Sequence, residues 1–296
     1  MRVFLTGSTG FIGSHVAREL LAAGHQVLGM TRSHAGSDAL RAIGAEPHHG
    51  TLEDLASLRL GAEQCDAVIH TAFDHDFAHF VDNCQKDARA IAALGEALNG
   101  SQRPLLITSG TPMGSPAPGE PADEDHFNAE HPNPRAASER AAEALLQRGL
   151  NVVVMRLSQI HDTVKQGLVT ELIKHARGTG VSAYVDAGMN HWSAAHISDT
   201  AQLYRLALEK HQPGARYHAT AESQVPFHLI AEALGEGLGL PVVSVTADEA
   251  MAQFGWLSSF VGRDMSSNSS KTRSRLRWVP TGPGLIEDIK GCFEQR

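Results

Sequence analysis

The chain has 296 residues, 42% of them hydrophobic and 20% charged, which is enough to bury one large core or two smaller ones. Its net charge of −8 argues against a nucleic-acid surface, which needs clustered lysine and arginine. No apolar run approaches the roughly 18–20 residues of a membrane span, and "MRVFLTG" lacks the basic and apolar regions of a signal peptide. With only three widely spaced cysteines, we expect a cytoplasmic protein that binds neither nucleic acid nor a membrane.

Short apolar runs alternate with helical patterns through the first half of the chain. The predicted strands are 2–7, 26–32, 46–50, 67–72, 103–110 and 151–157. The predicted helices are 11–24, 38–45, 52–63, a long one ending near 98, and 134–148. This alternation indicates βαβ units and a parallel sheet with helices on both faces. We therefore predict an α/β fold, with a doubly wound (Rossmann) sheet over residues 1–157. Residues 158–296 form mainly a smaller C-terminal substrate lobe, with some segments returning to the sheet.

The regular pattern is interrupted twice. Residues 114–134 are rich in proline and acidic residues, which predicts a surface loop acting as a lid or rim near a site. Beyond residue 157 we predict helices at 166–178, 197–210 and 225–239 and a strand at 215–220. The segment "FGWLSSF" (254–260) reads as part of a loop-rich region, and "SSNSS" (266–270) as a short low-complexity stretch.

Three glycines stand between the first predicted strand and helix, in "TGSTGFIG". Gly7 permits a tight turn, Gly10 lets the backbone approach a pyrophosphate, and Gly13 allows close helix–strand packing. The amides and the positive dipole end of the helix then face the anion. The segment predicts a dinucleotide site formed by Gly7, Ser8, Thr9, Gly10, Phe11, Ile12 and Gly13; the alternative is a glycine-rich turn without a ligand.

This segment resembles the TGxxGxxG pattern of the extended and atypical short-chain dehydrogenase/reductases, a group that includes the NAD-dependent epimerase/dehydratase enzymes. The resemblance continues through "VIHTAF" (68–73), "LLITSGTPMG" (105–114), "MRLSQIHD" (155–162), "WSAAHISDTAQLY" (192–204) and "SSKTRSRLRWVP" (269–280), so it covers essentially the whole chain. It implies a nicotinamide coenzyme and a small-molecule substrate. Relatives often dimerise through the helices after the fourth and fifth strands, so a homodimer is compatible with it.

The end of the second predicted strand favours NADPH over NADH. An NAD-specific site places an acid there to bind the ribose 2′-OH, but no acid lies between Gly29 and Gly36. Arg32 offers a permanently charged fork for a 2′-phosphate, and Ser33 can add a hydroxyl. The alternative is that Arg32 is an ordinary solvated residue.

The resemblance also assigns the remainder of the coenzyme site. Thr51 and Leu52 fall beside the adenine, although relatives often have aspartate in place of Thr51. The residues expected along the ribose and nicotinamide are Thr71, Ala72, Phe73 and Leu157.

The catalytic pair common in relatives is missing. They use serine or threonine after the fifth strand and Tyr-xxx-Lys on the next helix; alignment puts Ser109, Arg135 and Glu139 at these positions. Arginine stays protonated at working pH and is a poor proton donor. We therefore expect an atypical subgroup, with Arg135 and Glu139 forming an i,i+4 pair that stabilises the helix. The alternatives are that Arg135 polarises a substrate oxygen or that Glu139 binds the ribose.

Ser109 is the residue expected to hydrogen-bond the reacting oxygen, assisted by Thr108 or Thr111. Any of these hydroxyls could instead satisfy the backbone at the strand end. His161 and Tyr184 are candidate proton donors from the second lobe, with solvent as the alternative.

Two further groups of residues were weighed. His75 and His79 are spaced as in half a metal site, but no third ligand is evident, so we predict no metal and place His75 near the substrate mouth. Trp192, Phe254, Trp256 and Phe260 are the aromatic residues expected to shape an apolar substrate pocket, with core packing as the alternative.

The sequence thus predicts an NADP(H)-dependent oxidoreductase that transfers a hydride to or from a small carbonyl or alcohol. One alternative is a non-catalytic redox sensor that binds NADP(H) and signals through a partner. Another is a sugar-nucleotide epimerase or dehydratase, which needs basic residues for a second diphosphate; "GVSAYVDAGMNHW" (180–192) offers few.

Overall fold

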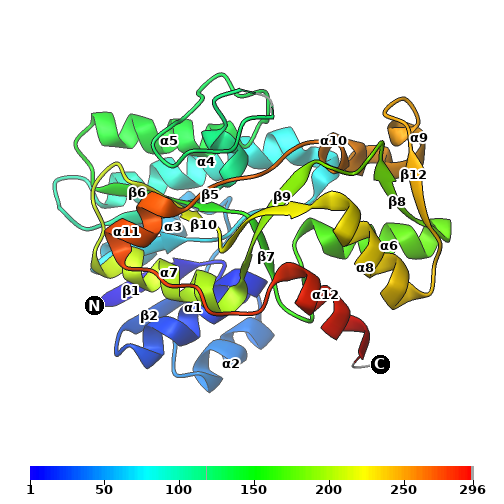
Figure 1. Ribbon diagram of the computed structural model, residues 1–296. Coiled ribbons are helices and arrows are strands. Elements are labelled where there is room, and N and C mark those ends of the chain that lie inside the picture. The colour runs from blue at the N-terminus through cyan, green and yellow to red at the C-terminus, as the bar shows by residue number, and fades with distance from the viewer. Residues whose placement is uncertain (118, 295–296) are drawn as a thin grey trace.

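The computed structural model in Figure 1 describes residues 1–117 and 119–294, apart from the side chain of Phe77. Its centre is a seven-stranded parallel sheet with the order β3-β2-β1-β4-β5-β6-β10. The strands are β1 (Arg2–Thr6), β2 (Gln26–Thr31), β3 (Glu46–His49), β4 (Ala67–His70), β5 (Leu105–Gly110), β6 (Val152–Leu157) and β10 (Arg216–Ala219). The strand order reverses between β1 and β4, which creates a crevice at the carboxyl edge where doubly wound folds bind their ligands.

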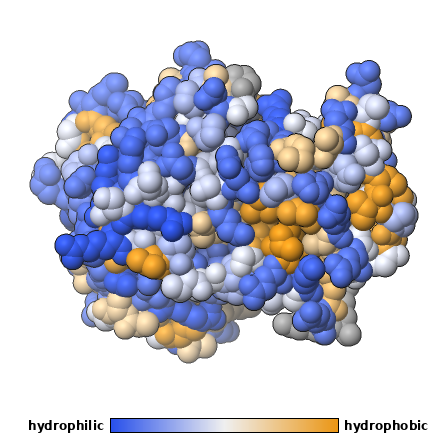
Figure 2. All heavy atoms as spheres, in the orientation of Figure 1, coloured by the Kyte–Doolittle hydropathy of each residue, from blue (hydrophilic) through white to orange (hydrophobic). Residues whose placement is uncertain are grey.

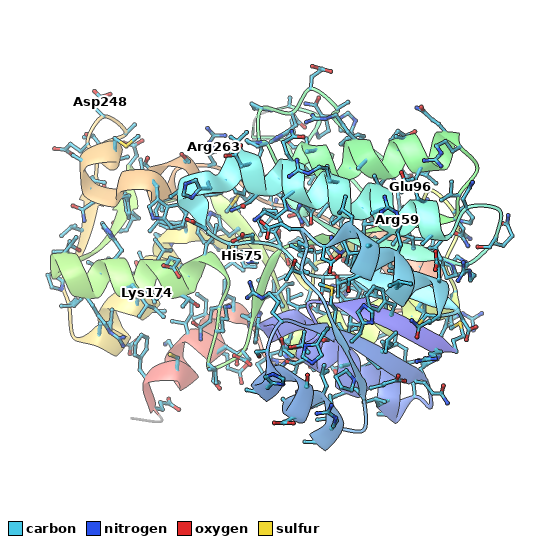
Figure 3. All side chains as sticks on the ribbon, turned by 180° about the vertical axis from the view of Figure 1, so that it is seen from behind. Arg59, His75, Glu96, Lys174, Asp248 and Arg263 are labelled. Atoms are coloured by element: carbon cyan, nitrogen blue, oxygen red, sulfur yellow. The ribbon has the colours of Figure 1, made fainter. Side chains whose placement is uncertain are left out.

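Helices cover both faces of this sheet, as the alternating sequence pattern predicted. One core contains side chains of α1 (Phe11–Ala22), α2 (His34–Ala42) and α7 (Ile197–Glu209). The opposite core contains side chains of α3 (Leu55–Glu63), α4 (Phe80–Ala97) and α5 (Ala136–Gln147). Figure 3 looks at this second face, where an Arg59–Glu96 ion pair of 2.7 Å links α3 to α4. The central strands are therefore buried on both faces, as parallel sheets require.

The second lobe has its own sheets and core. Its three-stranded sheet has the order β11-β9-β7, and β8 pairs with β12. The strands are β7 (Gln159–His161), β8 (Ser182–Val185), β9 (His191–His196), β11 (Glu222–Pro226) and β12 (Val242–Val245). The helices are α6 (Leu168–Thr179), α8 (Phe227–Leu238), α9 (Ala250–Phe254), α10 (Ser258–Val261) and α12 (Leu285–Glu294). The short 3-10 helix η3 (Gly255–Leu257) lies in this lobe, whereas η1 (Phe77–His79) precedes α4 and η2 (Thr111–Gly114) follows β5 in the first domain. In the view of Figure 2, apolar side chains gather over this lobe.

Segments from the second half return to the first domain. Strand β10 forms the edge of the large sheet beside β6, and α7 packs against α1. Helix α11 (Ser270–Leu276) contacts β10 and α7. Within the described ranges, none of the helices combines the length and apolar character that crossing a bilayer requires.

One local expectation is corrected: residues 254–260 are largely helical rather than loop, because they belong to the end of α9, to η3 and to α10. The low-complexity stretch 266–270 is well packed. Ser266, Ser267 and Ser269 are buried, and Ser269 donates to the Thr220 carbonyl at 2.6 Å.

Candidate active site

The turn between β1 and α1 is closed by its glycines. Gly7 has a φ of +69°, and a Cβ there would lie 2.7 Å from the Ala72 nitrogen. A Cβ on Gly13 would overlap the Gly7 carbonyl oxygen, so helix and loop touch at backbone distance. A Cβ on Gly10 would meet only the Gly7 oxygen, at 3.2 Å. The backbone therefore needs glycine at positions 7 and 13, and the start of α1 has the geometry expected of an anion cradle.

Side chains around this turn fasten it to the sheet. Ser8 is buried and donates to the Met30 carbonyl at 2.8 Å, which links the loop to β2. Thr71 donates to the Thr6 carbonyl at 2.7 Å, and the Ala72 amide donates to the Thr6 hydroxyl at 3.3 Å. Phe11 and Ile12 pack against the core beside α1, whereas Thr9 is exposed. Ser8 and Thr71 thus fix the conformation of the glycine turn, whereas the side chain of Thr9 is exposed to solvent.

Of the residues expected at the adenosine end, three make contacts within the protein and one, Arg32, is exposed. Ser33 caps α2 by accepting from the Gly36 amide at 3.1 Å, and Thr51 accepts from the amides of Glu53 and Asp54 at 3.3 and 3.2 Å. Leu52 packs on the core beside α3. Arg32 is exposed directly after β2, and its guanidinium makes no hydrogen bond or ion pair with the rest of the described chain.

The end of β5 presents two hydroxyls to opposite faces of the sheet. Thr108 donates to the His70 carbonyl at 2.7 Å and lies 2.6 Å from the Tyr204 hydroxyl, so it satisfies groups on the α7 side. Alternation along the strand turns Ser109 to the side of α4 and α5. Ser109 is only 4% exposed, and its hydroxyl has no hydrogen-bond partner among the described residues. Thr111 follows, buried, at the start of η2.

The expected i,i+4 pair between Arg135 and Glu139 is wrong. Arg135 instead pairs with Asp87 of α4 at 2.6 Å, donates to the Thr108 carbonyl at 2.9 Å, and also contacts the Ser138 hydroxyl. Its guanidinium carbon lies 4.0 Å from the centroid of the Phe73 ring. Arg135 immediately precedes α5, so packing against β5 and α4 turns its side chain away from Glu139.

Asp87 connects this guanidinium to the glycine turn. Its other carboxylate oxygen lies 3.0 Å from Nε2 of His70, and Nδ1 of His70 lies 2.7 Å from the Thr6 hydroxyl. All three side chains are fully buried. Burial alone would raise the pKa of Asp87, but the charge of Arg135 and hydrogen bonds from His70 and Ser138 outweigh it and hold the pKa below its usual range. The carboxylate is therefore ionised and fully partnered.

Glu139 belongs to a separate buried cluster. It accepts two hydrogen bonds of 2.8 Å from Arg156 of β6, and a third of 3.2 Å from Arg216. Arg156 also donates to the carbonyls of Asp123 and His126, at 3.0 and 2.8 Å. Since Glu139 and Arg156 are both fully buried, neither is available to a coenzyme.

The cluster around Arg156 also holds the proline-rich segment 114–134 in place. Arg156 holds two of its carbonyls, and the buried Glu124 accepts from the Lys271 amide at 2.9 Å and from the Thr272 hydroxyl. The segment is thus fastened to β6 and α11. These bonds favour the rim alternative over the lid.

The candidates in the second lobe lie in packed surroundings. His161 is buried; its Nδ1 lies 2.6 Å from Asp288, and its Nε2 has no partner among the described residues. Burial lowers the pKa of His161 although Asp288 opposes the change. Tyr184 packs on the core of this lobe. His79 pairs with Asp76 at 2.9 Å, and His75 contacts Phe73 with ring centroids 5.2 Å apart.

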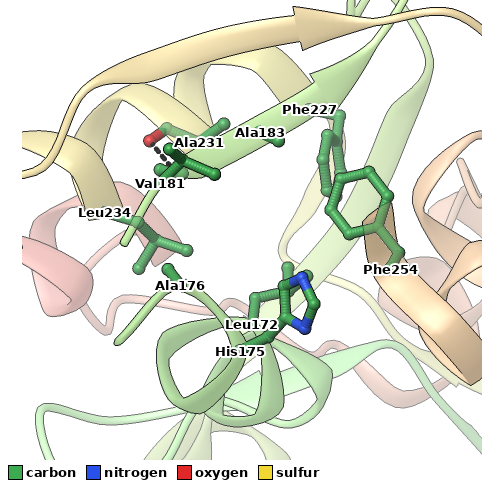
Figure 4. A pocket seen from close by; sticks show the side chains of 10 residues that line it. Leu172, His175, Ala176, Val181, Ala183, Phe227, Ala231, Leu234 and Phe254 are labelled. Carbon is green, nitrogen blue, oxygen red and sulfur yellow. Dashed lines mark hydrogen bonds between the residues drawn. The ribbon is translucent and has the colours of Figure 1, made fainter. Parts of the chain in front are cut away.

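Among the aromatic candidates, Trp192 is fully buried, with its ring centroid 4.9 Å from that of Phe227, which fits the packing alternative. Phe254 and His175 stack at 5.6 Å and line a small pocket of the second lobe between α6, β8 and α8 (Figure 4). Trp256 is 45% exposed and contacts Phe260 edge-on at 6.0 Å. No group of three or more histidine, cysteine or acidic residues within the described ranges is placed to hold a metal.

A family model described as the NAD dependent epimerase/dehydratase family matches residues 3–220. The chain belongs to this family. Its members are NAD(P)-dependent enzymes, so the resemblance seen in the glycine turn is confirmed.

Relatives and solved structures agree over nearly the full length. An uncharacterized protein of Schizosaccharomyces pombe is 44% identical over 290 residues, which is 98% of each chain. A 4-hydroxy-2-methyl-3-oxo-4-farnesyl-3,4-dihydroquinoline-1-oxide ketoreductase of Stigmatella aurantiaca is 26% identical and covers 94% of this chain and 92% of its own. The UDP-glucose 4-epimerase of Thermus thermophilus, solved with NAD, shares the fold with a TM-score of 0.75 at 20% identity, covering 99% and 98% of the two chains.

Several buried polar residues near the candidate site were not identified from the sequence. His70 interrupts an apolar strand, Arg156 interrupts another, and Asp87 lies on the buried side of α4. A charged or polar residue inside an apolar pattern was the available signal, because such residues are rarely buried without a partner. The partners could not be named, since they come from segments distant in sequence.

Proposed function

We propose that this chain is an NADP(H)-dependent oxidoreductase that transfers a hydride to or from a small carbonyl or alcohol substrate. The observation that carries the proposal is the pairing of two features at the carboxyl edge of the sheet. One is the glycine turn, where a side chain at position 7 or 13 would collide with backbone. The other is the buried, unpartnered hydroxyl of Ser109 at the end of β5. The ketoreductase named among the relatives supports the same class of reaction.

The residues present fit a dinucleotide coenzyme. Gly7, Gly10 and Gly13 would hold the pyrophosphate at the first turn of α1, and Arg32 would bind a 2′-phosphate. The preference for NADPH rests on Arg32, whose exposed guanidinium forms no ion pair within the described chain, although its charge is among the causes that lower the pKa of Asp74. When bound, the coenzyme supplies or accepts the hydride.

Ser109 is assigned to the reacting oxygen. A hydrogen bond from its hydroxyl stabilises the negative charge that develops there. Arg135 does not replace the usual tyrosine as a proton donor, because it stays ionised and is paired with Asp87. Glu139 does not replace the usual lysine, because Arg156 and Arg216 surround it.

His161 is better suited to accept a proton than to donate one. Its lowered pKa keeps the ring neutral near pH 7, and Nδ1–H donates to Asp288, which leaves the lone pair on Nε2. In the reducing direction we therefore assign proton delivery to solvent.

The test has two steps. Fluorescence titration of the purified protein should show tighter binding of NADPH than of NADH, and Arg32→Ala should remove most of that difference. A panel of ketones and aldehydes is then followed at about 340 nm, the absorption of the reduced nicotinamide. On any substrate found, Ser109→Ala should lower kcat by about 100-fold, as for loss of one oxyanion donor. Ser109→Thr, which keeps the hydroxyl, should restore part of the rate. Full turnover by Ser109→Ala would disprove its role.

One observation favours a second function, a non-catalytic NADP(H) sensor. Both positions of the usual proton-transfer pair carry residues committed to ion pairs, Arg135 with Asp87 and Glu139 with Arg156. A sensor would bind NADPH as tightly as proposed yet oxidise none of it with any member of the panel. Turnover above the uncatalysed rate with one carbonyl substrate would exclude this alternative.

A further inference from the structure

A tight turn of the second lobe reaches the glycine turn of the first. After β7, the Asp162 amide donates to the Lys165 carbonyl at 2.9 Å, and the Asp162 carboxylate accepts from the amides of Val164 and Lys165, both at 2.7 Å. Gln166 closes the turn by donating to the Asp162 carbonyl at 2.8 Å. These bonds fix the backbone from which the Lys165 side chain projects.

The Lys165 ammonium lies over the entrance of the proposed coenzyme site. Its Nζ is 5.7 Å from the centroid of the Phe11 ring, and Phe11 is the first residue of α1, directly after Gly10. The charge of Lys165 also reaches His75, in the segment after β4. Burial lowers the pKa of His75, and the charge of Lys165 is the next cause. Figure 3 shows His75 close to where the two lobes meet. Lys165 therefore lies near both segments, the one that follows β1 and the one that follows β4.

The charge of Lys165 is also unmatched. The chain has six lysines, all within the described ranges. Four of them, Lys86, Lys174, Lys271 and Lys290, form ion pairs with carboxylates, and Lys210 donates to the Leu276 carbonyl. Lys165 alone contributes neither an ion pair nor a hydrogen bond from its ammonium to the described chain. An exposed lysine without a partner is ordinary at a surface, but this one stands over an anion cradle.

We propose that Lys165 binds the pyrophosphate of the coenzyme from the side opposite the glycine turn. The proposal rests on the coenzyme binding proposed above. The turn of α1 offers amides from one lobe, and Lys165 adds a mobile positive charge from the other, a use to which lysine is suited because it binds phosphate as a point charge. A coenzyme held in this way bridges the two lobes.

The experiment compares Lys165→Ala and Lys165→Arg with the wild type by calorimetric titration of NADPH, NADH and ADP-ribose. Lys165→Ala should weaken all three by about the same factor, on the order of tenfold, as expected for one charge-assisted contact to phosphate. Lys165→Arg should retain most of the affinity. The matched control is Lys174→Ala, which removes the same charge from the same lobe, away from the crevice, and should leave all three affinities within about twofold, as for an exposed pair.

Each result has one meaning. Equal losses for the three ligands support the proposal, and ADP-ribose shows that the nicotinamide is not needed. A loss confined to NADPH would assign Lys165 to the 2′-phosphate and overturn the proposal, as would affinities equal to those of the Lys174→Ala control. If the wild-type protein bound none of the three ligands, the proposed function itself would fail, whereas normal wild-type binding with an unaffected Lys165→Ala variant would remove only the role of Lys165.

Discussion

The glycine turn at residues 7–13 and the start of α5 at residues 135–139 are both short segments at the carboxyl edge of the same sheet, yet they behave differently. In the turn, Gly7 and Gly13 have the tight-turn and close-packing roles that their spacing predicted, because a Cβ at either position would collide with neighbouring atoms. At the start of α5, Arg135 and Glu139 are four positions apart but form no ion pair with each other. Arg135 pairs with Asp87, and Glu139 pairs with Arg156. Spacing is informative when backbone geometry limits the choice, and much less so when long side chains can reach several elements.

The largest expected effect is on stability, and it tests the buried ion pair between Glu139 and Arg156. Replacing Glu139 by Ala leaves the Arg156 guanidinium buried without its carboxylate, so we expect a loss of about 3–5 kcal/mol in the free energy of unfolding, measured by urea denaturation. Glu143→Ala is the control, because Glu143 pairs with Arg216 while 42% exposed and should cost at most about 1 kcal/mol. A loss no greater than that of the control would show that the buried pair is not needed for stability.

The glycine turn should respond to a single added methyl group. Gly13→Ala places a Cβ against the Gly7 carbonyl, and we expect a loss of about 1–3 kcal/mol in stability together with weaker coenzyme binding. Thermal unfolding and NADPH titration measure the two effects. Gly178→Ala, where a Cβ would meet nothing within 4 Å, should leave binding unchanged and raise stability by up to about 1 kcal/mol through helix propensity. Equal behaviour of the two variants would contradict the packing described here.

Acid should weaken the Arg156 cluster through His218, whose Nε2 lies 3.2 Å from Arg156. Burial, followed by the charge of Arg156, lowers the pKa of His218 from 6.5 to about 3. The unfolded chain therefore binds this proton first, so the stabilising contribution is complete above about pH 6.5 and is lost progressively towards pH 3. We expect a slope of up to about 1.4 kcal/mol per pH unit from this residue.

The measurement is the free energy of unfolding as a function of pH for the wild type and for His218→Gln, which keeps a donor and an acceptor but does not titrate. The variant should show a flatter profile between about pH 3 and pH 6.5. His34→Gln, at an exposed position of α2, should follow the wild type. Parallel profiles for His218→Gln and the wild type would rule out this residue as the source of acid sensitivity.

The smallest expected effect is the coupling energy between Arg135 and Glu139, which tests directly whether the two side chains interact. A double-mutant cycle of Arg135→Ala and Glu139→Ala should give a coupling energy within about 0.5 kcal/mol of zero, because the two side chains share no partner. The same cycle for Glu139 and Arg156 should give a much larger coupling. A coupling of the first pair comparable to the second would restore the i,i+4 interpretation.

Much of the fold was predictable, because alternating apolar strands and amphipathic helices leave few arrangements other than a doubly wound sheet. The six strands expected in the first half are present, with boundaries that differ by one to a few residues. The smaller lobe was harder to predict. Several of its strands mix polar with apolar residues, as in β7 (QIH), β9 (HWSAAH) and β11 (ESQVP), so they lack the continuous apolar runs that mark the central strands.

By itself, the sequence determined the parallel sheet and the glycine turn. These follow from periodicity and from backbone conformations that only glycine tolerates. Only the tertiary structure decided which partners the buried charges have: Asp87 for Arg135, Arg156 for Glu139, and none within the described chain for Ser109 or Lys165. The reason is that a buried charge must find its counter-charge in space, and the nearest one belongs to a segment whose position is set by the packing of the whole sheet.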